Sequence, residues 1–322
     1  MDILISEELR APAIERLAKT YQVVAEPKLW QQPDKLRALI AEARVLMVRN
    51  QTQVTAELLH GAPKLLGIGR VGVGLDNIDL GRASSLGIVV AAPLNANATS
   101  VAELALGFML ALARKIPEAD RSTKAGNWDR KGCTGIELAG KTLAVCGLGR
   151  IGGTVARLGR AFGMRVVAFD PFVKADSAVV RESGVLLCGR IEEALAMADF
   201  VSVHLPSTPE TRRLFGASTF SATKPGAYFI NTSRGAVVDE AALLDALQSG
   251  RLAGAALDVR EFEPPAARGA LESLSNVVLT PHIAAFTVEA QERTFEAVAA
   301  DVERLLSGQP VLNFVNFDRP KR

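Results

Sequence analysis

A chain of 322 residues is longer than one ordinary hydrophobic core needs and has the length of two domains. Apolar residues make up 48% of it and charged residues 22%, which is the composition of a compact soluble protein. The 37 basic residues nearly balance the 35 acidic ones, and the longest basic run is the short segment 319–322. This balance gives no indication of a nucleic-acid or membrane surface.

The cysteines and the apolar runs indicate where the protein works. Cys133, Cys146 and Cys188 lie far apart and form no CxxC pair, so we expect neither a disulfide framework nor a zinc site. The apolar residues that follow Met1 are too few for a signal peptide. The most apolar stretch, 101–113, is too short to span a bilayer. We therefore expect a cytoplasmic protein.

Short apolar runs alternate with helical patterns through the first hundred residues. A helix is predicted over 11–19, and strands are predicted at 3–5, 23–24, 45–48, 65–68 and 88–91. These strands are continuously apolar and are separated by helical stretches. Such a pattern is typical of a parallel sheet that is covered by helices on both faces.

A second series of elements follows a long apolar helix. This helix is predicted over 99–115, with Thr99 or Ser100 as its N-cap and Pro117 as its stop. After a polar loop, strands are predicted at 142–146, 165–169, 200–203, 227–230, 253–257 and 277–279. A final helix over about 288–306 is long enough to return to the first series. We therefore predict two parallel α/β domains, with the second inserted into the first.

A glycine-rich loop opens the second series. The predicted strand 142–146 is followed at once by GLGRIG (147–152), and a helix is predicted over 154–162. In this setting Gly147 permits the tight turn, Gly149 lets a pyrophosphate approach the backbone, and Gly152 lets helix and strand pack closely. The helix N-terminus presents unpaired N–H groups and a positive dipole end to phosphates. The loop therefore predicts a dinucleotide site.

An acidic residue completes the pattern. Asp170 directly follows the next predicted strand and lies 18 positions beyond Gly152. A carboxylate at about this distance from the glycines hydrogen-bonds the adenosine ribose hydroxyls. It would also repel the additional phosphate of NADP. The alternative is that Asp170 and Pro171 form only a turn after a buried strand. Because strand, loop, helix, strand and acid follow in register, we predict NAD as the cofactor.

Three further charged residues lie where predicted strands run out into loops. Arg234 follows the strand 227–230, Glu263 follows 253–257, and His282 follows 277–279. Taken singly, each is compatible with an ordinary loop residue. Ligands of open α/β sheets bind outside the carboxyl ends of the strands, so the three side chains can face one crevice. Their joint position beside a dinucleotide site favours a functional role.

Four segments carry a family resemblance: GLGRIG (147–152), NTSRGAVVDE (231–240), ALDVREFEPP (256–265) and TPHIAAFT (280–287). In this order and spacing the chain resembles the D-isomer-specific 2-hydroxyacid dehydrogenase family over nearly its whole length. The segment RVGVGLDNIDL (70–80) also matches, and the similarity is strongest to D-3-phosphoglycerate dehydrogenases. The resemblance implies an NAD-dependent enzyme that moves a hydride to or from C2 of a small 2-hydroxy acid.

The resemblance also implies an architecture and a set of cofactor contacts. A Rossmann NAD-binding domain, 98–285, would be inserted into a flavodoxin-like substrate-binding domain made of 1–97 and 286–322. The family suggests a homodimer built on the cofactor domains, with the helix 101–113 as an interface element. The implied cofactor contacts, besides the glycines, are Arg150, Ile151, Asp170, Leu205, Thr232, Ser233 and Asp258.

By the family pattern, Arg234, Glu263 and His282 are the catalytic residues, and their chemistry suits the reaction. Oxidising a 2-hydroxy acid needs a base for the hydroxyl proton, and histidine as a residue type titrates near neutrality. A carboxylate paired with the histidine favours the imidazolium and fixes the ring. An arginine supplies two parallel donors for the substrate carboxylate. No metal is needed for these steps, and no cluster of metal ligands is visible in the sequence.

Three other arginines are candidates for a second anion on the substrate. Arg49 and Arg70 follow neighbouring predicted strands of the first domain, and Arg130 lies in the polar loop before the second series. The resemblance to phosphoglycerate dehydrogenases implies that such cations hold a substrate phosphate. The alternative is that they are ordinary surface arginines, since fold analogy does not fix a ligand.

The sequence leaves several functions open. One possibility is an enzyme that acts on 3-phosphoglycerate and its keto acid, 3-phosphohydroxypyruvate. The alternatives within the family are a hydroxypyruvate or glyoxylate reductase and a sulfolactate dehydrogenase. A non-catalytic NAD(H)-sensing scaffold is the alternative from another class, because corepressors that resemble the family can keep the catalytic trio. The ending near Arg322, without an interaction tail, favours the enzyme.

Overall fold

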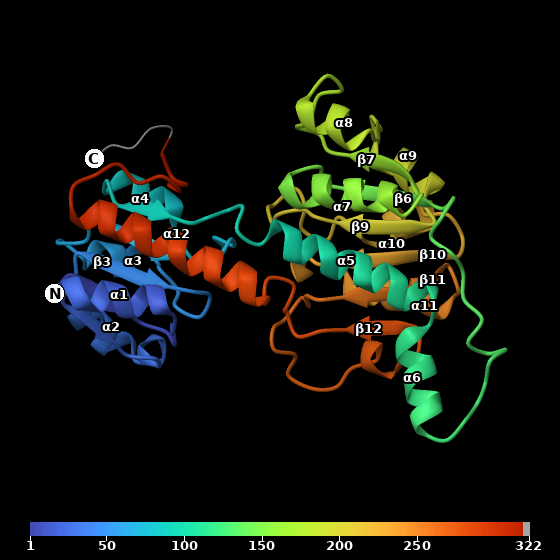
Figure 1. Ribbon diagram of the computed structural model, residues 1–322, viewed down its shortest axis with the longest axis horizontal. Coiled ribbons are helices and arrows are strands. Elements are labelled where there is room, and N and C mark those ends of the chain that lie inside the picture. Colours follow the sequence, from blue (N-terminus) through green and yellow to red (C-terminus); the bar gives the residue numbers. More distant parts are fainter. Residues whose placement is uncertain (318–322) are drawn as a thin grey trace. The chain divides into compact units, whose positions relative to one another are not determined.

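Two units make up the chain in the computed structural model, which describes residues 1–317; the basic run 319–322 lies outside the described residues. Unit 1 consists of Met1–Asn97 and Phe286–Arg322, and unit 2 consists of Ala98–Ala285 (Figure 1). The chain therefore leaves unit 1, builds the whole of unit 2, and then returns. Within the described residues, no helix is both long enough and apolar enough to cross a membrane.

Unit 1 contains a five-stranded parallel sheet. Its strands are β1 (Ile3–Ile5), β2 (Val23–Ala25), β3 (Val45–Val48), β4 (Gly67–Arg70) and β5 (Val89–Ala91). They pair in the order β2-β1-β3-β4-β5, which is the flavodoxin-like order. The sheet is short because each strand has only three or four residues, most of them buried on both faces.

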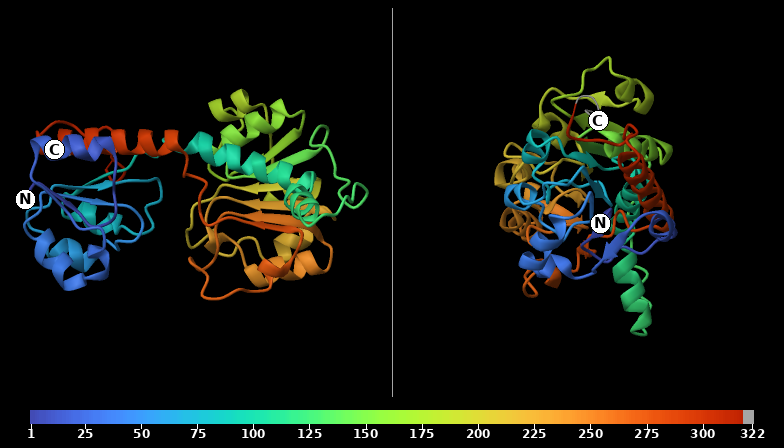
Figure 2. Two further views of the ribbon diagram at one scale, coloured as in Figure 1. Left: turned by 60° about the horizontal axis from the view of Figure 1, so that its bottom comes forward. Right: turned by 90° about the vertical axis from the view of Figure 1, so that its left-hand side faces the viewer.

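Helices cover both faces of this sheet (Figure 2). They are α1 (Pro12–Thr20), the 3₁₀ turn η1 (Leu29–Gln31), α2 (Pro33–Ile40), α3 (Ala56–His60), α4 (Leu80–Ser85) and α12 (Val288–Leu306). α12 packs against α1 and against β4, so a helix from the C-terminal part of the chain covers a sheet that is built from the first hundred residues. The approach of α12 requires a glycine, because a Cβ at Gly69 would lie 2.9 Å from Cγ1 of Val298.

Unit 2 contains a seven-stranded parallel sheet in the order β12-β11-β10-β9-β6-β7-β8. Its strands are β6 (Thr142–Cys146), β7 (Arg165–Phe169), β8 (Leu186–Leu187), β9 (Phe200–Val203), β10 (Ala227–Asn231), β11 (Leu252–Leu257) and β12 (Val277–Leu279). Read from β8 to β11, this is the Rossmann order 3-2-1-4-5-6 with one strand added. The direction of winding reverses between β6 and β9, which is where such sheets bind their ligands.

Two helical layers enclose this sheet. On one face α5 (Ala98–Ala113) and α7 (Arg150–Ala161) lie side by side (Figure 1), and α8 (Ala178–Ser183) contacts α7. On the other face lie α9 (Ile191–Met197), α10 (Ala217–Ala222) and α11 (Glu240–Gln248). α6 (Ile116–Lys124) and the loop after it protrude from the unit (Figures 1 and 2).

The predicted fold class of two parallel α/β sheets, the second inserted into the first, is confirmed, and the differences are local. β4 begins at Gly67, two residues later than predicted, and the two-residue strand β8 was not predicted. α5 begins at Ala98, so Thr99 and Ser100 lie inside the helix and the predicted N-cap is wrong. Pro117 lies in the first turn of α6, a position that tolerates proline because its N–H has no partner in the helix.

The core of unit 2 predicts a strong stability effect at Phe229. This side chain on β10 is 0% exposed and lies 5.2 Å, ring to ring, from both Phe215 and Phe220. Phe229→Ala removes these contacts and leaves a cavity, so we expect a loss of about 3–5 kcal/mol. Thermal unfolding followed by circular dichroism should show a lower midpoint. Phe172→Ala is the control, because Phe172 is 94% exposed, and an equal loss there would contradict the assignment of the core.

Candidate active site

The glycine-rich loop has the geometry of a phosphate cradle. It joins β6 to α7, and Gly147 has a φ of 94°, in the left-handed region that favours glycine. A Cβ at Gly152 would lie 1.9 Å from the carbonyl oxygen of Gly147, so the helix can pack this closely only with glycine there. A Cβ at Gly149 would meet nothing within 4 Å. The space beside Gly149 is therefore open, at the N-terminus of a twelve-residue helix.

Asp170 lies against this loop. Its carboxylate accepts hydrogen bonds from the backbone N–H of Leu148 at 2.8 Å and from that of Phe172 at 2.9 Å. A carboxylate offers about four acceptor positions, so capacity for ribose hydroxyls is left. Leu148 lies between the first two glycines, so the acid and the loop hold each other in position.

Other residues near the loop also fit a dinucleotide. The hydroxyl of Thr232 is buried and has no hydrogen-bond partner among the described residues, as expected of a group that awaits a ligand. Arg150 is exposed at the first position of α7, with Ile151 half-buried beside it. Leu205 packs against the loop, 3.0 Å from the place of a Cβ at Gly147. Ser233 differs, because its hydroxyl already donates to Asn231.

Asp258 organises the loop that carries His282. It is 1% exposed, and its Oδ1 accepts from the hydroxyl of Thr280 at 2.5 Å and from the N–H of Ile283 at 2.8 Å. Its Oδ2 accepts from the N–H of Ala284 at 2.8 Å, and its carbonyl oxygen accepts from the N–H of His282 at 2.8 Å. These bonds lie on both sides of His282 and hold it at a φ of 56°, which non-glycine residues seldom adopt.

His282 and Glu263 form a close pair. Nδ1 of the imidazole lies 2.6 Å from Oε2 of Glu263, and the other carboxylate oxygen, Oε1, accepts from the backbone N–H of Arg260 at 2.9 Å. Burial alone would raise the pKa of Glu263, but these two hydrogen bonds and the charge of Arg234 hold it below its usual value. Glu263 is therefore a carboxylate near neutrality, and Nε2 is the ring nitrogen left for a ligand.

Arg234 follows β10 in a turn that is fixed by Asn231. The side-chain amide of Asn231 donates to the carbonyl oxygen of Arg234 at 2.9 Å, and its oxygen accepts the N–H of Ser233 at 3.0 Å. Nη1 of Arg234 donates to the carbonyl oxygen of Ser233 at 2.7 Å. The predicted trio therefore follows three adjacent strands, β10, β11 and β12, at the edge where β6 and β7 end in the phosphate loop and Asp170.

The three arginines predicted for a second anion fall in different units. Arg49 and Arg70 belong to unit 1 and Arg130 belongs to unit 2. Arg70 is only 7% exposed and Arg49 is half-buried, so neither is an ordinary surface residue. Nη2 of Arg49 donates to Oε1 of Gln291 at 2.7 Å, and its guanidinium lies 4.4 Å from the centre of the Phe286 ring. Burial lowers the pKa of Arg49, although the charge of Glu7 opposes this.

The sequence interpretation missed the residues that hold the loops in shape. Asn231 is 0% exposed, and Glu7 is 3% exposed and accepts the N–H groups of Arg49, Asn50, Gln51 and Thr52. Asp258 was predicted only as a cofactor contact. The signal in the sequence that could have identified these loop-holding residues was a polar residue directly at the end of an apolar strand. Groups of three or more His, Cys, Asp or Glu side chains able to hold a metal do not occur in residues 1–317.

Comparison with known proteins identifies the family. Residues 106–284, more than half of the chain, match the family described as D-isomer specific 2-hydroxyacid dehydrogenase, NAD binding domain. The chain belongs to this family. Residues 106–284 are its NAD-binding domain, and the predictions of family and cofactor are confirmed.

Individual members of the family match nearly the whole chain. The D-3-phosphoglycerate dehydrogenase of Archaeoglobus fulgidus is 45% identical over 98% of this chain and 59% of its own length. That of Rattus norvegicus is 43% identical over 98% of this chain and 58% of its own. The chain thus spans less than two thirds of these relatives. The crystal structure of an Aquifex aeolicus D-lactate dehydrogenase with NAD and lactic acid is 31% identical, with a TM-score of 0.87 over 98% of this chain and 99% of that one.

The open space beside Gly149 predicts a selective effect on cofactor binding. In Gly149→Ala the new methyl group meets no protein atom within 4 Å but occupies the approach of the pyrophosphate. We expect an unchanged unfolding midpoint and at least about tenfold weaker NADH binding, the loss of about 1.4 kcal/mol. Calorimetric titration with NADH measures the affinity. Gly107→Ala on α5 also meets nothing within 4 Å and is the control, and an unchanged affinity in Gly149→Ala would contradict the cradle.

Proposed function

We propose that the protein is an NAD-dependent dehydrogenase that transfers a hydride between C2 of a small D-2-hydroxy acid and NAD. The observation that supports this most directly is the His282–Glu263 pair, with Nδ1 and Oε2 2.6 Å apart. The pair lies at the same sheet edge as the phosphate loop, so a proton-transfer group and a cofactor site share one side of unit 2. NAD, when bound, supplies or accepts the hydride.

The three catalytic side chains divide the remaining work. His282 takes the hydroxyl proton at Nε2 during oxidation and returns it during reduction, because Nδ1 is engaged by Glu263. Glu263 fixes the ring and stabilises the imidazolium, as a carboxylate paired with a general base does. Arg234 binds the substrate carboxylate through two parallel N–H donors and orients C2.

The substrate we propose is 3-phosphoglycerate with its keto acid, 3-phosphohydroxypyruvate. In support, the two relatives described above are named D-3-phosphoglycerate dehydrogenases. Arg49 also suits a second anion, because its guanidinium is held by a neutral amide and an aromatic ring. Reduction of hydroxypyruvate or glyoxylate and oxidation of sulfolactate are the alternatives, because the catalytic trio acts only on the common part of these acids.

A homodimer built on unit 2 is part of the proposal. The apolar residues of α5, the interface element we predicted, largely pack inside unit 2, against α7, β10 and β11. Two of the exposed apolar side chains of unit 2 lie instead on α6 and the loop after it, where Ile116 is 53% and Trp128 is 81% exposed. Sedimentation at several concentrations measures the assembly, and a monomer throughout would contradict it.

Turnover and its loss on substitution test the catalytic assignment. NADH oxidation is followed with hydroxypyruvate, glyoxylate, pyruvate, 3-phosphohydroxypyruvate and sulfopyruvate. We expect turnover of at least one acid, and a fall of about two to four orders of magnitude in His282→Ala, the usual contribution of a positioned acid–base group. His60→Ala is the control, because His60 lies on α3 and contacts Arg82. Near-normal activity in His282→Ala would contradict the mechanism, and NADH binding without any turnover would favour a sensing scaffold.

Arg49 tests the second anion. Charge-assisted hydrogen bonds contribute about 1.5–3 kcal/mol, so Arg49→Gln should lower kcat/KM for 3-phosphohydroxypyruvate by about one to two decades. Activity on pyruvate and glyoxylate should change little. Arg37→Gln on α2 is the control, because Arg37 pairs with Asp34 and Glu57 at the surface. If the unaltered protein uses hydroxypyruvate as well as 3-phosphohydroxypyruvate, the second-anion site does not exist.

A further inference from the structure

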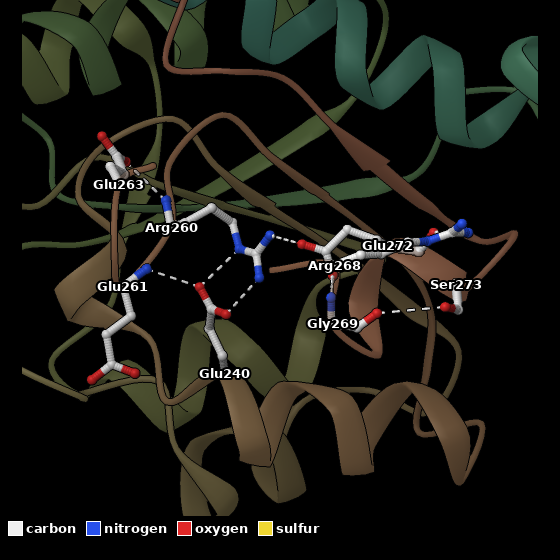
Figure 3. A network of polar contacts seen from close by, with 8 residues as sticks. All are labelled: Glu240, Arg260, Glu261, Glu263, Arg268, Gly269, Glu272 and Ser273. Atoms are coloured by element: carbon white, nitrogen blue, oxygen red, sulfur yellow. Dashed lines mark hydrogen bonds and ion pairs between the residues drawn. The ribbon is translucent and has the colours of Figure 1, made fainter. Parts of the chain in front are cut away.

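Arg260 lies at the centre of a network of charged side chains, on the loop after β11 that also carries Glu263 (Figure 3). Its guanidinium donates from Nε and Nη2 to the two oxygens of Glu240, at 2.9 and 2.8 Å. From Nη1 it donates to Oε1 of Glu272 at 2.5 Å. The side chain is only 15% exposed, and its partners are about as well covered, so water screens these charges less than it screens surface pairs.

The network joins three separate segments. Glu240 is the first residue of α11, and Glu272 lies in the 3₁₀ turn η3 (Leu271–Ser273). Glu240 also accepts the backbone N–H of Glu261 at 2.8 Å, so it holds two successive residues of the loop after β11. Glu272 in turn accepts the N–H of Gly269 at 3.0 Å. The guanidinium therefore fastens the loop to a helix on one side and to a turn on the other.

The backbone of Arg260 contacts both segments that carry the catalytic residues. Its N–H donates to Oε1 of Glu263, the oxygen that His282 does not use. Its carbonyl oxygen lies against the 3₁₀ turn η2 (Gly235–Val237), which begins directly after Arg234. A Cβ at Gly235 would be only 1.8 Å from that oxygen, so the two backbones are in direct contact.

We propose that Arg260 is a positioning residue: by gripping Glu240 and Glu272, its guanidinium holds the backbone N–H that orients Glu263 toward His282. The inference rests on the proposed function for its importance in catalysis. Its structural part, that the guanidinium controls the environment of the Glu263 carboxylate, can be measured without any substrate. Arg260 touches neither substrate nor cofactor in this assignment, and it acts through Glu263.

The charges around the loop are consistent with this arrangement. Burial alone would raise the pKa of Glu240, but the hydrogen bonds from Arg260 hold it below its usual value, and they lower the pKa of Glu272 as well. Both carboxylates are therefore ionised near neutrality. The charged groups that surround Glu263 or flank its loop are His282, Arg234, Arg260, Glu240, Glu272, Asp258, Glu261, Arg213 and Arg268.

Arg260→Met tests the proposal, because it keeps a long side chain and removes the guanidinium N–H donors that contact Glu240 and Glu272. Without the contacts to Glu240 and Glu272, we expect the backbone N–H of residue 260 to move away from Glu263. Loss of this hydrogen bond to a charged group should raise the pKa of Glu263 by about one unit. The side-chain carboxyl signal of Glu263, assigned by its absence in Glu263→Gln, is titrated by NMR in ¹³C-glutamate-labelled full-length protein. Activity should fall about ten- to hundredfold in kcat with little change in KM for NADH, since a displaced catalytic group mainly affects the transition state.

The pH dependence gives a further readout with a fixed sign. The active form needs Glu263 ionised, and its pKa is lowered in the folded protein, so activity is present above that pKa and is lost as the pH falls through it. A raised pKa in Arg260→Met therefore moves the acid limb of kcat/KM to higher pH. Arg260→Lys keeps the charge but cannot contact both carboxylates with a planar guanidinium. Its acid limb should therefore lie between those of the unaltered protein and Arg260→Met.

Arg213→Met is the matched control. Arg213 also ties this loop to the start of α11, because it donates to Glu261 at 2.9 Å and lies 3.8 Å from Asp239. Its side chain is 54% exposed, however, and it does not contact Glu263, so the Glu263 titration should be unchanged. Equal shifts in Arg213→Met and Arg260→Met would overturn the proposal, because a general loosening of the loop would then explain both.

The outcomes separate this inference from the proposed function. An unshifted Glu263 titration in Arg260→Met overturns it, even if the unaltered protein is an active dehydrogenase. A shifted titration supports it even if no acid is turned over. If Arg260→Met does not fold, Glu272→Gln removes one of the two anchors from outside the loop, and it should give a smaller shift in the same direction; no shift there overturns the proposal.

Discussion

Parallel pairing is the constraint on which the candidate site depends. All strands of the unit 2 sheet run the same way, so the segments that leave them emerge at one edge. The phosphate loop leaves β6, Asp170 follows β7, and Arg234, Glu263 and His282 follow β10, β11 and β12. Residues that are more than a hundred positions apart in the chain thereby become neighbours of one site. Each parallel pair requires a crossover, and the crossover helices supply the two apolar layers that bury the sheet.

Loops at that edge lack the backbone hydrogen bonds that paired strands make. Buried polar side chains bind the backbone groups of these loops instead. Asp258 accepts backbone N–H groups on the far side of His282. Asn231 accepts the N–H of Ser233 and donates to the carbonyl oxygen of Arg234, which fixes that turn. Unit 1 repeats the device, since Glu7 accepts four N–H groups of the loop that begins at Arg49. A buried carboxylate or amide is costly unless its polar atoms are satisfied, so each of these groups imposes a defined loop shape.

Charged groups at these loops keep Glu263 ionised and hold Arg260 in place. Glu263 remains ionised although it is partly buried, because it accepts from both His282 and the N–H of Arg260. Arg260 in turn is fastened by two carboxylates that only the tertiary fold brings to it. In the proposed reaction the hydride chemistry belongs to the cofactor, and the protein would contribute a fixed proton carrier, a carboxylate clamp and a phosphate cradle.

The sequence by itself determined the fold class, because continuous apolar strands separated by helices are buried on both faces only in a parallel sheet. It also located the phosphate loop and its acid, since Gly147, Gly149, Gly152 and Asp170 form a local pattern that needs no distant partner. The proposed catalytic trio was predicted from its position at strand ends and from the family resemblance. Tertiary structure alone decided that Asp258 holds the His282 loop and that Arg260 meets Glu240 and Glu272. Those contacts join segments without any periodic relation in sequence, and a charged residue in a loop looks the same whether it is solvated or clamped.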